Sequence, residues 1–196
     1  MPLLKLVETA VLAKVSLLQL REKSLSARDL YAITASVVKL TYGSSTRLLV
    51  NDRADIAFAA GADGVHLTSS SIEPAVVRRT FGERFLIGCS THSIEEANKA
   101  KKGGANFAVF GPVFATASKR HYGEPVGLES LARAAAAVAP FPLLALGGIS
   151  IENVGDCFRA GASGIAGIGL FNEQTKLTEI VKYIRTEFLK NETRHD

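Results

Sequence analysis

The chain has 196 residues, of which 47% are hydrophobic and 21% are charged, and its formal net charge is +4. A chain of this length fits a single domain, and its apolar content excludes an intrinsically disordered protein. The basic residues are spread along the sequence instead of forming a concentrated stripe, so we expect small anionic ligands and no nucleic-acid partner.

Short apolar segments alternate with longer amphipathic segments along the chain, which is the pattern of βα units around a parallel sheet. The predicted strands are residues 16–21, 47–51, 64–67, 85–90, 107–113, 142–147 and 164–169. The predicted helices are residues 3–13, 27–42, 53–60, 73–81, 94–102, 128–138, 152–160 and 173–190. Several strands are apolar on both faces, as expected when helices cover a barrel and side chains fill its interior. We therefore predict an α/β fold, a TIM (β/α)8-type barrel that forms one domain over residues 1–196.

Seven strands are predicted with eight helices and the first element is a helix, so either the barrel lacks its first strand or the true start of the chain lies upstream of Met1. If the strand is absent, two strands are left with unpaired edges. Such a barrel would either gape or recruit a partner, which leaves a homo-oligomer open.

The sequence also bears on the compartment. No segment has the roughly 18 consecutive apolar residues of a membrane-spanning helix, and the first residues lack the pattern of a signal peptide. Cys89 and Cys157 are too few and too far apart for a disulfide framework or a zinc site. We therefore expect a cytoplasmic protein with reduced, buried thiols and no membrane partner.

Active sites of such barrels lie at the C-terminal ends of the strands, and the residues there are polar in this chain. The first predicted strand ends in residues 19–23. Period-two alternation places Gln19, Arg21 and Lys23 on the same side of this segment. Two cations and an amide at a barrel mouth suit a diphosphate, which arginine can bind in bidentate fashion. A solvated basic turn explains these three residues equally well.

Three further strand ends carry polar residues. Asn51 could donate to a ligand and Asp52 could hold Mg²⁺ that bridges phosphate oxygens, although Asp52 alone is better explained as the N-cap of the next helix. Ser90 closes a later strand just before a helix, where a hydroxyl could meet phosphate. His66 stands alone among apolar residues, which is more typical of a core histidine than of a catalyst, so it is left out of the predicted site.

The last third of the chain has a second set of candidates. A long loop after the fifth strand carries Thr116, Ser118 and Lys119, and long loops in compact domains are often binding loops. Glycines, among them Gly148 and Gly169, end the last two strands, which is the usual phosphate-binding place of these barrels. Tight packing also demands glycine, but glycine pairs at two adjacent strand ends favour phosphate binding.

Six segments together carry a resemblance to a known family. They are QLREK at 19–23, VNDRADIA at 50–57, GADGVHL at 61–67, STHSIEEA at 90–97, FGPVFATASK at 110–119 and ALGGIS at 145–150. The chain resembles the thiamine-phosphate synthase and TenI-like thiazole tautomerase superfamily over residues 3–171. The resemblance implies a transferase that joins hydroxymethylpyrimidine diphosphate to thiazole phosphate and releases pyrophosphate. It also implies Mg²⁺ as the cofactor, and a reaction in which the diphosphate leaves before the thiazole nitrogen captures a pyrimidine carbocation.

The resemblance further implies a role for each matched residue. The pyrimidine diphosphate would be contacted by Gln19, Arg21, Lys23, Asn51, Ser90 and Lys119, with Arg21, Lys23 and Lys119 as the catalytic cations. Asp52 would bind Mg²⁺. The thiazole phosphate would be held by Thr116, Ser118, Gly148, Ile168 and Gly169.

Three departures from the family pattern keep two alternatives open. Ser71 stands where synthases have a second metal-binding Asp, Gly169 stands where a serine is usual, and the first strand is missing. These departures favour a thiazole tautomerase, or a catalytically silent barrel that binds thiazole phosphate as a regulator. Pro112 stands where one type of tautomerase has a catalytic histidine, and together with the retained diphosphate residues it favours the synthase.

Overall fold

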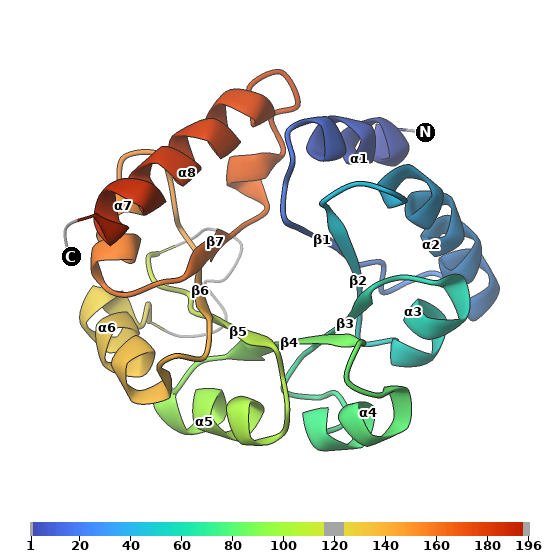
Figure 1. Ribbon diagram of the computed structural model, residues 1–196, viewed down its shortest axis with the longest axis horizontal. Helices are drawn as coiled ribbons and strands as arrows, with labels where there is room; N and C mark the ends of the chain where they lie inside the picture. Colours follow the sequence, from blue (N-terminus) through green and yellow to red (C-terminus); the bar gives the residue numbers. More distant parts are fainter. Residues whose placement is uncertain (1, 116–123, 194–196) are drawn as a thin grey trace.

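The computed structural model describes residues 2–115 and 124–193. In this part of the chain, seven parallel strands form one sheet in the order β1-β2-β3-β4-β5-β6-β7, which curls into a barrel with helices around its outside (Figure 1). The strands are β1 (Leu17–Leu20), β2 (Arg47–Asn51), β3 (Gly64–Leu67), β4 (Leu86–Thr91), β5 (Phe107–Phe110), β6 (Leu143–Leu146) and β7 (Gly164–Ala166). The helices are α1 (Pro2–Leu12), α2 (Ala27–Thr41), α3 (Ala54–Ala60), α4 (Pro74–Phe81), α5 (Ile94–Lys102), α6 (Gly127–Val138), α7 (Val154–Arg159), the 3-10 helix η2 (Gly169–Phe171) and α8 (Leu177–Glu192).

Side chains of alternate strand residues separate the interior of the barrel from the layer under the helices. Leu49, Phe107 and Val109 are buried against one another and against apolar residues of other strands, with no helix residue in the cluster, so this set fills the interior. The intervening residues, such as Val50 and Val65, pack against helix side chains on the outside. A residue two positions further along any strand therefore faces the same side.

The predicted barrel fold and its seven strands are confirmed, whereas several predicted ends are wrong. The strand predicted over 107–113 stops at Phe110, because Gly111 has a φ of 156° and Pro112 has no N–H to continue the ladder. The strand predicted over 164–169 stops at Ala166, and Gly169 begins η2 instead. The helix predicted to begin at residue 173 begins at Leu177.

β1 and β7 are the edge strands of the described sheet. Their residues are mostly part-exposed, whereas every residue of β3 and β5 is buried. Helices α1 and α8 pack against each other beside these edges, where Ala10, Ala13, Leu177 and Val181 form a small buried cluster (Figure 1). No helix in the described part of the chain is long and apolar enough to span a membrane.

Candidate active site

Four polar side chains lie on the inward face of four consecutive strands, near their C-terminal ends. Gln19 is two residues beyond the interior Leu17 on β1, and Asn51 is two beyond Leu49 on β2. His66 on β3 is directly opposite Asn51 in the register, and Ser90 on β4 is two residues beyond Gly88, the partner of His66. We call these residues, Gln19, Asn51, His66 and Ser90, the polar band.

The first half of the polar band adjoins two unpaired cations. Gln19 Nε2 donates a hydrogen bond of 2.9 Å to Asn51 Oδ1, which fixes the orientation of both amides. Arg21 and Lys23 follow directly after β1 and are exposed, and neither has a hydrogen bond or ion pair with any described residue. Their charges are therefore available to an anionic ligand at this end of the barrel.

Asp52 lies beside the polar band in a conformation that only a few residue types adopt. Its φ is 63°, in the left-handed region, and its N–H donates to the carbonyl oxygen of His66 at 2.9 Å. Its carboxylate accepts a hydrogen bond from the Ser71 hydroxyl. The alternative reading of Asp52 as a helix N-cap is wrong, because α3 has Arg53 at that position and no side-chain capping bond.

His66 and Ser90 form the second half of the polar band. His66 Nε2 lies 2.9 Å from Ser90 Oγ, and only 5% of the histidine surface is exposed. Burial lowers the pKa of His66 to about 4, so the ring is neutral at pH 7. The expectation of a buried core histidine is confirmed. The hydrogen-bond partner of His66, Ser90, is nevertheless one of the predicted site residues. Period-two alternation from Gly64 could have indicated that His66 faces the interior.

The neutral state of His66 predicts that folding stability depends on pH. In the unfolded chain the histidine pKa returns to about 6.5, so between pH 6.5 and 4 the unfolded state binds a proton that the folded state does not. The free energy of unfolding should therefore fall as the pH is lowered through this window, by roughly 3 kcal/mol from this group in total. Urea unfolding at pH 7 and pH 5 measures the change. The variant His66→Gln should lack most of it, and an equal loss in the variant would contradict this assignment.

The ends of β6 and β7 form the opposite side of the barrel mouth. Gly147 and Gly148 follow β6, and residues 111–115 run close beside them: Val113 N donates to Leu146 O at 2.8 Å, and Phe114 N donates to Gly147 O at 3.0 Å. Since Leu146 pairs with Ala166, the segment with Ile168 and Gly169 leaves the neighbouring strand. Ile168 is 69% exposed. Thr116, Ser118 and Lys119 lie outside the described residues.

Ser26, Ser93 and Ser150 each stand just before a predicted helix, where serine is a preferred N-cap, but Ser150 does not cap α7. Its own N–H donates to Asn153 Oδ1 at 2.8 Å, and Asn153 Nδ2 donates to Gly148 O at 3.0 Å. The Asn153 side chain thus holds the turn after Gly148 closed. The predicted caps Ser26 and Ser93 are confirmed, because each accepts the N–H of the residue three positions later.

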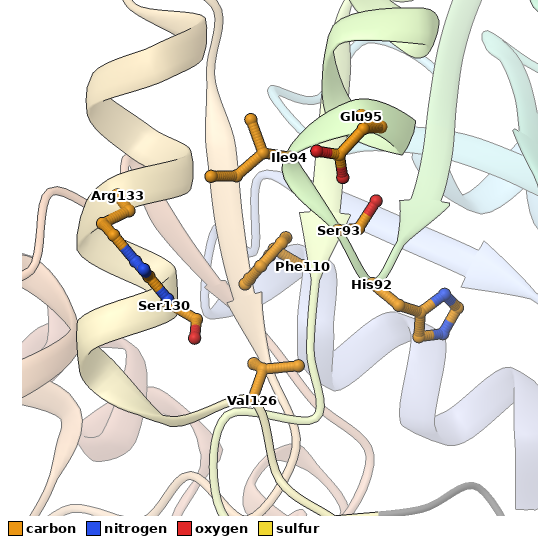
Figure 2. A pocket seen from close by; sticks show the side chains of 8 residues that line it. All are labelled: His92, Ser93, Ile94, Glu95, Phe110, Val126, Ser130 and Arg133. Carbon is orange, nitrogen blue, oxygen red and sulfur yellow. The ribbon is translucent and has the colours of Figure 1, made fainter.

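Within the described residues, no group of three or more His, Cys, Asp or Glu side chains could hold a metal ion. Asp52 is the carboxylate that follows directly after the polar band. A cleft of about 250 Å³ lies outside the polar band, between the starts of α5 and α6. Figure 2 shows Phe110 between Glu95 on one side and Arg133 on the other. None of the predicted site residues that the structure describes lines this cleft.

Comparisons with known proteins agree with one another. The model of a family described as thiamine monophosphate synthase matches residues 1–171. A thiamine-phosphate synthase from Chlorobium luteolum is 41% identical over 83% of this chain and 76% of its own length. Another, from Methanoculleus marisnigri, is 38% identical over 92% of this chain and 85% of its own length. The structure of a thiamine phosphate pyrophosphorylase from Pyrococcus furiosus matches 96% of this chain and 90% of its own chain, with a TM-score of 0.82 and 28% identity.

Proposed function

Because this chain belongs to the thiamine monophosphate synthase family, we propose that it joins hydroxymethylpyrimidine diphosphate to thiazole phosphate and releases pyrophosphate. It is thus a transferase of the thiamine-phosphate synthase type. The observation that carries the proposal is that Arg21 and Lys23, which have no partner among the described residues, follow β1 next to the hydrogen-bonded Gln19 and Asn51 at one end of the barrel.

The pyrimidine diphosphate occupies this side of the mouth. Its departing diphosphate gains negative charge as the bond to the pyrimidine methylene breaks, and fixed cations stabilise that charge more in the transition state than in the ground state. Arg21, Lys23 and Lys119 supply those cations. Gln19, Asn51 and Ser90 orient the substrate through hydrogen bonds, and their positions on strands keep them in place.

Asp52 would hold Mg²⁺, and the ion would supply positive charge next to the diphosphate. Mg²⁺ at phosphate sites commonly takes one or two carboxylates and fills its remaining positions with phosphate oxygens and water, and one carboxylate suits that pattern. When bound, the ion neutralises charge on the diphosphate oxygens. The Ser71 hydroxyl, which donates to Asp52, orients the carboxylate but adds no second negative charge.

A single carboxylate predicts weak Mg²⁺ binding without substrate, and Ser71→Asp should strengthen it. The new carboxylate would lie beside Asp52, which Ser71 already contacts. We expect free Mg²⁺ to bind the variant at least 10-fold more tightly, because a second charged ligand replaces a neutral one. Isothermal titration of Mg²⁺ into wild type and variant, without substrate, measures this. Ser69→Asp, in the same turn, serves as the matched control, and equal gains in both variants would contradict the assigned role.

The thiazole phosphate occupies the opposite side of the mouth, held by Thr116, Ser118, Gly148, Ile168 and Gly169. The close approach of residues 111–115 to Gly147 and Gly148 supports this, because these residues immediately precede Thr116 and Ser118 in the sequence. Parallel-sheet barrels often bind phosphate at this place. The thiazole nitrogen would then face the pyrimidine carbon across the mouth.

The decisive test is pyrophosphate release measured with both substrates and Mg²⁺, with product identified by mass spectrometry. We expect release only when both substrates and the metal are present. Isomerisation of a thiazole phosphate without pyrimidine or metal would identify a tautomerase instead. Binding of thiazole phosphate without either reaction would identify a silent binding protein.

A further inference from the structure

The contact between His66 and Ser90 is the part of the polar band to which the proposed reaction has so far given no role. Ser90 is a proposed substrate contact, whereas His66 is almost fully buried behind it, with its Nε2 atom 2.9 Å from the Ser90 hydroxyl oxygen. The ring is held in this place by its neighbours. Its centroid lies 6.2 Å from that of Phe107, and a Cβ atom on Gly88 would lie 2.9 Å from His66 Nδ1 and 2.3 Å from the Phe107 ring.

The surroundings of the ring also decide which nitrogen carries the proton. Nδ1 is turned toward Gly88 and makes no hydrogen bond with a described residue. A proton on Nδ1 would therefore be a buried donor with no acceptor among the described residues, which is unfavourable. A proton on Nε2 points at Ser90 Oγ and satisfies both atoms.

We propose that His66 is a positioning residue that donates from Nε2 to Ser90 Oγ and thereby directs the Ser90 hydroxyl hydrogen toward the diphosphate of the bound pyrimidine. This rests on the proposed function, since the ligand of Ser90 comes from it. A serine hydroxyl has one donor and two acceptor positions, and a donor behind it occupies one acceptor position. The hydroxyl hydrogen is then free to meet an anionic oxygen, which is what a diphosphate offers.

Because His66 acts through Ser90, substitutions of the two residues should not have additive effects. We expect His66→Phe to lower kcat/KM for the pyrimidine substrate about 10-fold, and Ser90→Ala to lower it at least as much. The double variant should be no worse than Ser90→Ala alone, because the donor has no further effect once its acceptor is gone. Effects that multiply, or an unchanged His66→Phe enzyme, would overturn the proposal.

Two amide substitutions separate positioning from packing. The Nε2 amide of glutamine reaches close to the place of histidine Nε2, whereas the shorter asparagine amide reaches only the place of Nδ1. His66→Gln should therefore keep most of kcat/KM, and His66→Asn should resemble His66→Phe. The control is Thr91→Val, which removes a buried hydrogen bond of 3.2 Å to Val109 O on the outward face of β4. It should lower thermal stability but not kcat/KM. If His66→Gln were as impaired as His66→Asn, the histidine would serve packing alone.

A readout that needs no turnover keeps this inference separate from the proposed function. The ¹⁵N chemical shifts of the His66 ring distinguish the two neutral tautomers, and we expect the Nε2–H form at pH 7. Titration with inorganic pyrophosphate and Mg²⁺ should show equal losses of affinity in His66→Phe and Ser90→Ala. If wild type released no pyrophosphate but passed both tests, the proposed reaction would fail and the positioning role would stand. An Nδ1–H tautomer would overturn the positioning role whatever the reaction.

Discussion

Arg21→Ala should lower kcat/KM for the pyrimidine diphosphate by about 10²- to 10³-fold, which is the size of effect seen when one preorganised transition-state donor is removed. Arg21 follows β1 immediately and has no hydrogen bond or ion pair with any described residue, so its removal breaks no such interaction within the described part of the chain. The whole loss should therefore appear in substrate binding and turnover. Steady-state kinetics with the thiazole phosphate saturating, beside a thermal melt that should not move, measure it.

The matched control for this prediction is Arg84→Ala. Arg84 is also exposed, but it precedes β4 and so lies at the opposite end of the barrel from the polar band. Arg84→Ala removes the same charge from the chain but leaves the charges of the site unchanged. The kcat/KM of this variant should stay within about 2-fold of wild type, because distant exposed charges are screened by salt. Similar losses in both variants would mean that net charge steers the substrate, and the assignment of the diphosphate site would be wrong.

Local patterns were sufficient to predict the barrel, because the central strands are buried apolar segments and the longer helices have an amphipathic face. The same period-two pattern points Gln19 into the barrel, where it meets Asn51. The errors lie where one residue overrides the pattern. Val113 is apolar like a strand residue, yet the φ of Gly111 and the missing N–H of Pro112 had already ended β5. Ser150 has a side chain suited to an N-cap, but the Asn153 side chain closes this turn instead by accepting the Ser150 N–H.

The polar contacts between strands needed the register, which no local pattern supplies. The apolar sequence neighbours of His66 predict a core residue, and His66 is buried. Its contact with Ser90, 24 residues later in the chain, depends on the pairing of β3 with β4. The hydrogen bond from Ser71 to Asp52 depends likewise on the turn after β3 folding back over β2. Both contacts are long-range, so no local pattern predicts them.

Gly148→Ala should raise the KM for thiazole phosphate on the order of 100-fold, since misplacing a binding group by about 1 Å can cost that much. Gly148 has a φ of 62°, which costs an alanine roughly 1–2 kcal/mol. The new Cβ would also lie 2.6 Å from Ala115 O and 2.7 Å from Phe114 Cβ, so the 111–115 segment would have to move away from the end of β6. Steady-state kinetics with varied thiazole phosphate measure the change.

Gly43→Ala separates the backbone strain from the crowding. Gly43 has a φ of 73°, close to that of Gly148, but a Cβ there would meet no atom within 4 Å, and it precedes β2 at the other end of the barrel. Both variants should therefore lose similar stability from strain, and only Gly148→Ala should lose thiazole phosphate affinity. If Gly148→Ala lost stability alone, the glycine would serve only the packing of the 111–115 segment, and the phosphate would have to be held elsewhere. A loss of affinity with little loss of stability would instead mean that the Cβ blocks the anion itself, because backbone amides bind phosphate closely only where no side chain intervenes.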